Sequence, residues 1–148
     1  MGAPIPYKNK IIAVSGGFDP VHVGHVRMIQ EAAQLGEVLV IANSDDWLMR
    51  KKGYVFMNFK ERAEILSAFK GVVKVVEAKD SDNTVCASLY EHKIDIFANG
   101  GDRKSDNVPE VAICAKLDID MVWNIGGEKI QSSSELVDRI AEVELQDS

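Results

Sequence analysis

Five short apolar runs, separated by stretches with helical spacing, most constrain how this chain of 148 residues can fold. Runs of four or five mainly apolar residues are typical of strands buried on both faces of a sheet. These runs span residues 11–14, 38–42, 72–76, 94–98 and 121–125. Helical spacing and capping residues predict helices at 26–36, 58–69, 83–92, 108–117 and 133–142. The sequence therefore predicts strands and helices in alternation.

Residues at the expected helix ends support this assignment. Gly36 stands where the first helix would end, and Asn58 with Glu61 matches a capping box. Pro109 falls in the first turn of a later helix. Alternating strands and helices favour a parallel sheet covered on both faces. We predict an α/β fold, a Rossmann-like doubly wound sandwich with a five-stranded parallel sheet, in one domain over 1–148 with a loose segment at about 1–9.

Charge and composition disfavour several classes of partner. A net charge of −6, from 17 basic and 23 acidic residues, opposes broad binding to nucleic acid. No apolar run approaches the roughly 18 residues that suggest a membrane span, and no export signal is apparent. Cys86 and Cys114 have apolar neighbours and are predicted to be buried. We expect a cytoplasmic protein with neither membrane nor nucleic-acid partners.

The segments that follow the five predicted strands are the candidate ligand-binding loops, because doubly wound sheets bind ligands at the carboxyl ends of their strands. They span residues 16–25, 43–58, 79–84, 99–107 and 126–134. The basic cluster Arg50-Lys51-Lys52 lies in the second loop. In an acidic chain such a cluster can hold a phosphate locally, although runs of charge are more often a solvated surface.

The first loop has the composition of a phosphate-binding segment. Gly16, Gly17 and Gly24 allow close approach of the backbone to a ligand. His22 and His25 stand where the next helix begins, and their N–H groups suit phosphate oxygens. A zinc site would need a third ligand and a glutamate between the histidines, which this motif lacks. Taken singly, either histidine could be an ordinary helix cap.

This loop resembles a known signature. Gly17-Phe18-Asp19 followed by His22-Val23-Gly24-His25 is similar to the G-x-F-D-x-x-H-x-G-H pattern of the cytidylyltransferase-like nucleotidyltransferases. The resemblance continues through Lys51 and residues 60–62 to residues 100–102 and 130–134. The chain resembles the adenylyltransferases that form ADP-heptose and the glycerol-3-phosphate cytidylyltransferases. These belong to one superfamily with phosphopantetheine adenylyltransferase and archaeal FAD synthetase. The Gly100-Gly101-Asp102 step looks closest to the ADP-heptose and archaeal FAD enzymes.

The resemblance implies an enzyme that transfers AMP or CMP from a nucleoside triphosphate to a phosphorylated sugar, polyol or similar small molecule, with release of pyrophosphate. It implies ATP or CTP as co-substrate, with ATP somewhat favoured, and Mg²⁺ carried by the triphosphate. The acceptor attacks directly, without a covalent enzyme intermediate. Relatives often form homodimers, so a homodimer is a further expectation.

The resemblance also assigns roles to residues. His22, His25 and Lys51 are the expected catalytic groups. Residues expected to bind the nucleotide are Gly17, Phe18, Gly24, Gly101, Asp102, Lys129, Ser132, Ser133 and Ser134. The acceptor is expected near Asp19, Lys52 and Arg103, although Asp19 could equally hold its own loop. No residue is expected to bind a metal directly.

Other polar and aromatic residues have open assignments. Asp82, Asn83 and Thr84 are either acceptor contacts or helix caps, and the second is the commoner role for isolated polar residues. Trp123 is expected in the core.

Two departures from the family pattern affect these assignments. The arginine that opens the last motif in cytidylyltransferases is missing, and Lys129 is its candidate substitute. Met49 replaces a lysine of the glycerol-3-phosphate enzymes, which disfavours glycerol phosphate as acceptor. A non-catalytic nucleotide sensor with the same fold is the main alternative. The H-x-G-H element also occurs in class I aminoacyl-tRNA synthetases, but this chain has no room for their anticodon-binding domain.

Overall fold

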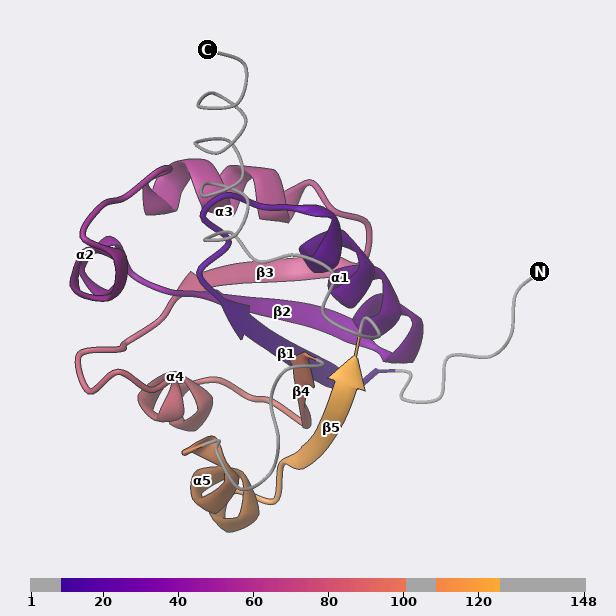
Figure 1. Ribbon diagram of the computed structural model, residues 1–148. Helices are drawn as coiled ribbons and strands as arrows, with labels where there is room; N and C mark the ends of the chain where they lie inside the picture. The colour runs from indigo at the N-terminus through magenta and orange to yellow at the C-terminus, as the bar shows by residue number, and fades with distance from the viewer. Residues whose placement is uncertain (1–8, 101–108, 126–148) are drawn as a thin grey trace.

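A computed structural model describes residues 9–100 and 109–125 of the chain. In this part of the chain, five parallel strands form one sheet with the order β3-β2-β1-β4-β5 (Figure 1). The strands are β1 Ile11–Gly16, β2 Glu37–Ala42, β3 Val72–Glu77, β4 Ile96–Gly100 and β5 Asp120–Ile125. The chain adds strands outward from β1 in one direction and then returns to add β4 and β5 on the other side. The predicted five-stranded parallel α/β sandwich is confirmed.

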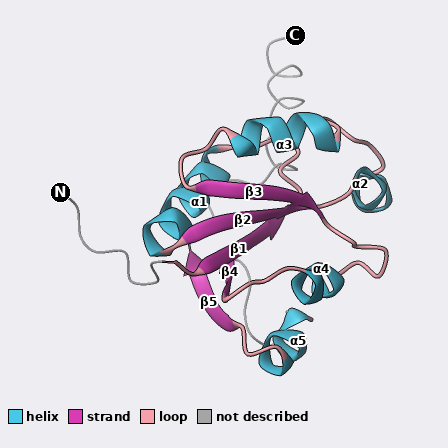
Figure 2. Cartoon of the chain, turned by 180° about the vertical axis from the view of Figure 1, so that it is seen from behind, coloured by secondary structure: helices cyan, strands magenta, loops and turns pink. Residues whose placement is uncertain are grey.

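Helices cover both faces of this sheet. They are α1 Val23–Leu35, α2 Asp45–Lys52, α3 Phe59–Ser67, α4 Cys86–Glu91 and α5 Glu110–Lys116. Figure 2 shows α1 and α3 on one face and α4 and α5 on the other, with α2 beyond the carboxyl ends of the strands. The connections after β1 and β4 therefore leave the sheet on opposite faces, which places the switch in strand order between these two neighbouring strands.

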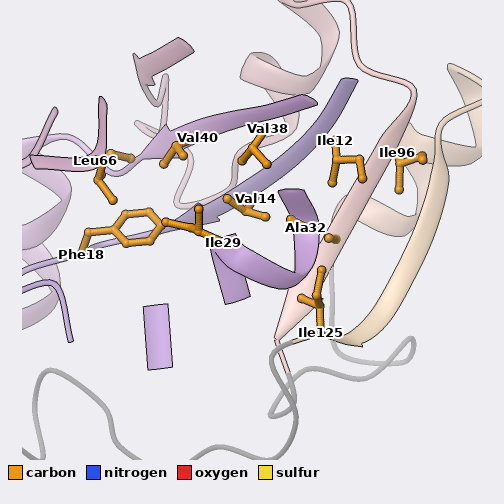
Figure 3. Packing of buried hydrophobic residues seen from close by; sticks show 12 residues of the cluster. Ile12, Val14, Phe18, Ile29, Ala32, Val38, Val40, Leu66, Ile96 and Ile125 are labelled. Atoms are coloured by element: carbon orange, nitrogen blue, oxygen red, sulfur yellow. The ribbon is translucent and has the colours of Figure 1, made fainter. Parts of the chain in front are cut away.

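Two apolar clusters hold the layers together, one on each face. The first packs alternate residues of the strands, such as Ile12, Val14 and Val40, against Ile29 of α1 and Leu66 of α3 (Figure 3). The second lies beneath α4 and α5 and contains the strand residues that alternate with those of the first, such as Ala13 and Ile41. Burial on both faces explains why the strands appear in the sequence as nearly continuous apolar runs.

The helix α2 was not expected, because residues 43–58 were predicted as a loop. Its sequence, DDWLMRKK, buries only Leu48, so it lacks the apolar stripe that identifies most helices. Its ends are nevertheless well capped, since Ser44 accepts a hydrogen bond from the backbone N–H of Trp47 and Gly53 adopts φ +83° after the last turn. Acidic residues in the first turn and basic residues in the last also match the helix dipole.

Several smaller expectations are corrected. The strand β4 begins at Ile96 rather than at residue 94, because Asp95 bonds to Ile11 with both its backbone and its carboxylate as the chain enters the sheet. The helix predicted at 83–92 is shorter, Cys86–Glu91. Cys86 is half-buried rather than buried, whereas Cys114 lies in the core, where burial raises the pKa of its thiol to about 11.

Trp123 is half-buried and belongs to neither apolar cluster, contrary to the expectation of a core position. The loose segment at 1–9, apart from Asn9, and the helix predicted at 133–142 lie outside the described residues. Within the described ranges, no helix is long and apolar enough to cross a membrane.

Candidate active site

The loop between β1 and α1 lies at the switch point of the sheet. It is joined to the end of β2 by a hydrogen bond from the backbone N–H of Asn43 to the carbonyl of Gly16, at 2.9 Å. Phe18 anchors the loop from below, since its ring is 1% exposed, belongs to the core cluster and lies 4.7 Å from the ring of His25. Expected to contact the nucleotide, Phe18 instead places its ring in the core, where it supports His25.

His22 and His25 form a reciprocal cap at the start of α1. Nδ1 of His22 accepts from the N–H of Gly24 at 3.0 Å, and Nδ1 of His25 accepts from the N–H of His22 at 3.1 Å. The two rings stack, with centroids 3.9 Å apart. Because both Nδ1 atoms accept backbone protons, hydrogen bonding assigns the proton of each neutral ring to Nε2. The capping role and a phosphate-binding role are therefore compatible, since they use different nitrogens.

The environment of His25 keeps it neutral. Burial, and to a lesser degree the nearby His22, lowers the pKa of His25 from 6.5 to about 3. A neutral imidazole at the positive end of a helix dipole acts as a hydrogen-bond donor through Nε2–H rather than as a cation. The ring of His25 is thus prepared to meet an anion, whose charge would favour protonation of this ring.

We expect the lowered pKa of His25 to make the folded protein sensitive to acid. Between pH 6.5 and about 3, the unfolded chain binds a proton at this position that the folded chain does not. The free energy of unfolding must then decrease as the pH falls through this window. Urea unfolding at pH 6.5 and pH 4.5 should show a smaller loss for His25→Gln than for the wild type. Equal losses in the two proteins would contradict the assignment.

Asp19 holds the loop rather than facing outward. Its side chain is 1% exposed, and its carboxylate accepts from the N–H groups of Phe56 at 2.8 Å and Met57 at 2.5 Å. It also pairs with Nζ of Lys52 at 3.1 Å, while its carbonyl accepts from the same amine at 2.8 Å. Of the two roles considered for Asp19, the contacts support the ordering of its own loop. They also tie that loop to the segment between α2 and α3.

The two lysines at the end of α2 have different surroundings. Lys52 is held by Asp19 and lies 4.8 Å from the ring of Tyr54. Lys51 is exposed, and its Nζ lies 6.0 Å from the ring of Trp47. Lys51 can therefore swing on its stem, as a group that follows a phosphate must. Lys52 is fixed as the positive partner of a buried carboxylate.

Arg62 of α3 was not among the predicted site residues, yet it connects the loops around the site. Its guanidinium is 0% exposed and donates to the carbonyls of Gly17 at 2.8 Å, Asn43 at 2.7 Å and Met57 at 3.0 Å. It also pairs with Asp45 of α2 at 2.7 Å. One planar cation thus fixes the ends of β1 and β2 and both ends of the segment that carries the lysines.

Asp80 makes a second buried junction that the sequence did not indicate. Its carboxylate accepts from Asn43 Nδ2 at 3.0 Å and from the N–H and Oγ of Ser44 at 2.9 and 2.6 Å. Its carbonyl accepts from Arg50 at 2.8 Å. The loop after β3 therefore positions the cap of α2 and, through it, the basic end of that helix.

The acceptor candidates next to Asp80 are bonded within the protein, although none of them is the N-cap of α4, which is Val85. Asp82 accepts from the N–H and Oγ of Thr84, and these bonds lower the pKa of its carboxyl group. Oγ of Thr84 accepts from the N–H of Cys86 at the start of α4, and Asn83 accepts from Arg50. Gly101, Asp102, Arg103, Lys129, Ser132, Ser133 and Ser134 lie outside the described residues.

Comparison with protein families agrees with this geometry. The model of the cytidylyltransferase-like family matches residues 13–143, which include β1 from its third residue onward and all of β2, β3, β4 and β5. This chain belongs to the cytidylyltransferase-like family. Relatives of this chain include nucleotidyltransferases. The histidine pair and the basic end of α2 therefore lie in a domain of nucleotidyltransferase type.

Individual relatives are distant. The chain is 33% identical to the bifunctional protein HldE of Hydrogenovibrio crunogenus, over 93% of this chain but 29% of that protein. It is 30% identical to glycerol-3-phosphate cytidylyltransferase of Bacillus subtilis, over 63% of this chain and 72% of the relative. A lipopolysaccharide core biosynthesis protein from Thermoplasma volcanium has a similar structure, with TM-score 0.66, 25% identity and coverage of 81% of this chain and 98% of that one.

Proposed function

We propose that this chain transfers AMP or CMP from a nucleoside triphosphate to the phosphate of a small molecule, with release of pyrophosphate. The observation that carries the proposal is the cap of α1, in which two stacked histidines accept backbone N–H groups through Nδ1 at the start of a helix. Such a terminus attracts phosphate oxygens through the helix dipole and through N–H donors. Membership of a family that includes nucleotidyltransferases supports a triphosphate as the anion.

The proposed step is an in-line displacement. An oxygen of the acceptor's phosphate forms a bond to the α-phosphorus, and the bond from that phosphorus to the oxygen bridging to the β-phosphate breaks. Pyrophosphate leaves with the electron pair, so the protein needs no nucleophile. Holding both reactants in place can contribute about 7–11 kcal/mol. Each well-placed donor to the developing charge contributes about 2.7–4 kcal/mol.

Residues of this chain would divide these tasks. His22 and His25 would donate to the triphosphate, and Gly17 and Gly24 would let it approach the backbone. Lys51, exposed on α2, would follow the α-phosphate as its charge changes. Gly101, Asp102, Lys129 and residues 132–134 would supply the remaining contacts to the nucleotide.

Magnesium fits this scheme as part of the substrate. The carboxylates of Asp19 and Asp80, buried near the site, are both engaged by several donors. In the described part of the chain, no three His, Cys, Asp or Glu side chains come together as a metal site would require. We propose that Mg²⁺ arrives bound to the triphosphate, where it neutralises phosphate charge.

The acceptor is proposed to be a phosphorylated sugar, polyol or similar molecule that binds beside Lys52, with Arg103 a further candidate contact. Because Lys52 is paired with Asp19, the acceptor's phosphate would bind to Nζ of Lys52 while the ion pair with Asp19 stays in place. The names of the relatives include a cytidylyltransferase and an adenylyltransferase, so ATP and CTP both remain candidate donors. A homodimer in the cytoplasm remains part of the proposal.

Pyrophosphate release tests the proposal directly. Purified protein should release pyrophosphate with ATP or CTP only when a suitable acceptor is present. The acceptor panel should contain heptose 1-phosphate, glycerol 3-phosphate and flavin mononucleotide. Lys51→Met should lower the rate about 10²-fold or more, whereas Lys60→Met, an exposed lysine on α3, should not. Binding of a triphosphate without turnover on any acceptor would instead favour a nucleotide sensor.

A further inference from the structure

Asn99, near the end of β4, has a buried side-chain amide that makes no hydrogen bond within the described part of the protein. Its side chain is 2% exposed, and neither Nδ2 nor Oδ1 has a hydrogen-bond partner. Among the described residues, these two are the buried side-chain polar atoms without a partner. A buried amide without partners costs free energy, so proteins retain one mainly where something else completes it.

The position of Asn99 suggests what completes it. Asn99 lies on the strand next to β1, at the carboxyl end where the strand order switches. Pairing with β5 is irregular there, since Ala98 is opposite Val122 and Gly100 is opposite Ile125, which leaves two residues of β5 facing Asn99. The extra residue belongs to β5, the bulged strand, so the alternation of side chains along β4 continues through Asn99.

The other described buried asparagine provides a contrast. Asn43 is the first residue after β2, is 7% exposed, and donates through Nδ2 to Asp80 at 3.0 Å. Both residues lie at carboxyl ends of strands in the same sheet, but only Asn43 is built into the protein's own hydrogen bonds. The difference separates a structural amide from one that is kept for a ligand.

The alternation of side chains along β4 indicates which ligand. Ile96 and Ala98 belong to the cluster beneath α1, whereas Phe97 belongs to the cluster beneath α4 and α5. Asn99 therefore lies on the face of Phe97, opposite to the face of α1 with its two histidines. The histidines proposed to hold the phosphates of the triphosphate lie on the other face, so we assign the group that reaches Asn99 to the second reactant. A ribose hydroxyl of the nucleotide, whose proposed contacts Gly101 and Asp102 follow in the sequence, is the competing source, and the KM of the triphosphate tests it below.

We propose that Asn99 binds a hydroxyl group of the acceptor through its amide, an inference that rests on the proposed transferase function. A neutral amide offers one acceptor and two donors, which match a hydroxyl better than a phosphate, for which cations serve. Only a small group can reach an amide at this depth. The acceptor is thus a hydroxyl-bearing phosphate ester, and Asn99 selects for a hydroxyl at one position.

Thermal unfolding without ligand tests whether the amide lacks a partner in the protein. Asn99→Leu keeps the branched shape and removes the unsatisfied atoms, so its Tm should equal or exceed that of the wild type. Asn43→Leu is the matched control and should lower the Tm by roughly 5 °C, because the buried carboxylate of Asp80 loses one of its donors and keeps only those of Ser44. A comparable loss in Asn99→Leu and in the smaller Asn99→Ala would overturn the proposal.

Kinetics test which reactant Asn99 binds. With the acceptor that supports turnover in the panel, Asn99→Ala should raise the KM of the acceptor about tenfold and leave the KM of the triphosphate within about twofold. An analogue of that acceptor lacking the recognised hydroxyl should react equally well with wild type and Asn99→Ala. A rise in the triphosphate KM alone, or no change in either KM, would refute the assignment.

The two arms separate this inference from the proposed function. A wild-type protein that releases no pyrophosphate with any acceptor contradicts the transferase proposal, while the unfolding comparison still decides whether Asn99 is unpartnered. An active wild type with unchanged kinetics in Asn99→Ala contradicts the inference alone.

Discussion

Replacement of His25 by alanine is expected to lower turnover about 10²–10³-fold while the protein remains folded. The ring of His25 is half-buried, stacks on His22 and accepts the N–H of His22 through Nδ1. Its Nε2–H is therefore fixed before the substrate binds, and a donor fixed in advance stabilises transition-state charge without the cost of reorganisation. Turnover should be measured by pyrophosphate release under saturating triphosphate and acceptor.

Two controls make this result specific. His92, which follows α4, is the remaining histidine of the three in the chain, and His92→Ala should leave turnover close to that of the wild type. Circular dichroism of His25→Ala should retain the wild-type spectrum, because the cap of α1 also uses Nδ1 of His22. Near-normal turnover in a folded His25→Ala protein would exclude a direct role for this ring.

The architecture could be predicted from the sequence largely because β1, β2 and β4 are buried on both faces. Residues such as Ile12, Ala13 and Val14 alternate between the two clusters, so the runs that form these central strands are apolar almost throughout. Gly-rich turns and helix caps then fixed where the runs end. These are local properties, which a single sequence displays directly.

The helix α2 could not be predicted because its stability depends on distant residues. Its cap, Ser44, is held by Asp80, which lies 36 residues further along the chain. Its first turn is tied by Asp45 to Arg62. In the sequence, Ser44 and Asp45 belong to a polar stretch, Asp80 is an isolated aspartate, and Arg62 lies in a charged segment, so nothing indicates that they are in contact.

Within the site, the sequence located the histidines but not the groups that support them. A Gly-rich loop with two histidines has a recognisable pattern, whereas the Lys60-Glu61-Arg62 segment has the composition of an exposed helix. Its arginine is buried because three carbonyls from separate loops meet at one point. Asp19 was ambiguous for the same reason, since its N–H partners at 56 and 57 come from another segment.

Arg62→Met is expected to lower the free energy of unfolding by about 3–5 kcal/mol, because three carbonyl groups lose a donor and each such loss costs about 1–3 kcal/mol. Methionine keeps much of the stem but removes all the donors. The carbonyls of Gly17, Asn43 and Met57 lose their bonds to the guanidinium, and Asp45 loses its partner. Because domains of this kind are typically stable by only about 5–15 kcal/mol, the loss should be plain in urea unfolding.

Matched variants show whether the loss comes from the buried network. Arg27→Met, on the exposed part of α1, should change stability by no more than about 0.5 kcal/mol. Arg62→Lys should recover little, because a single ammonium cannot donate to three carbonyls and a carboxylate in the geometry of the planar guanidinium. A change below about 1 kcal/mol in Arg62→Met would mean that the loops hold their positions without this residue. A large change would identify Arg62 as the residue that joins the histidine loop to the lysine-bearing helix.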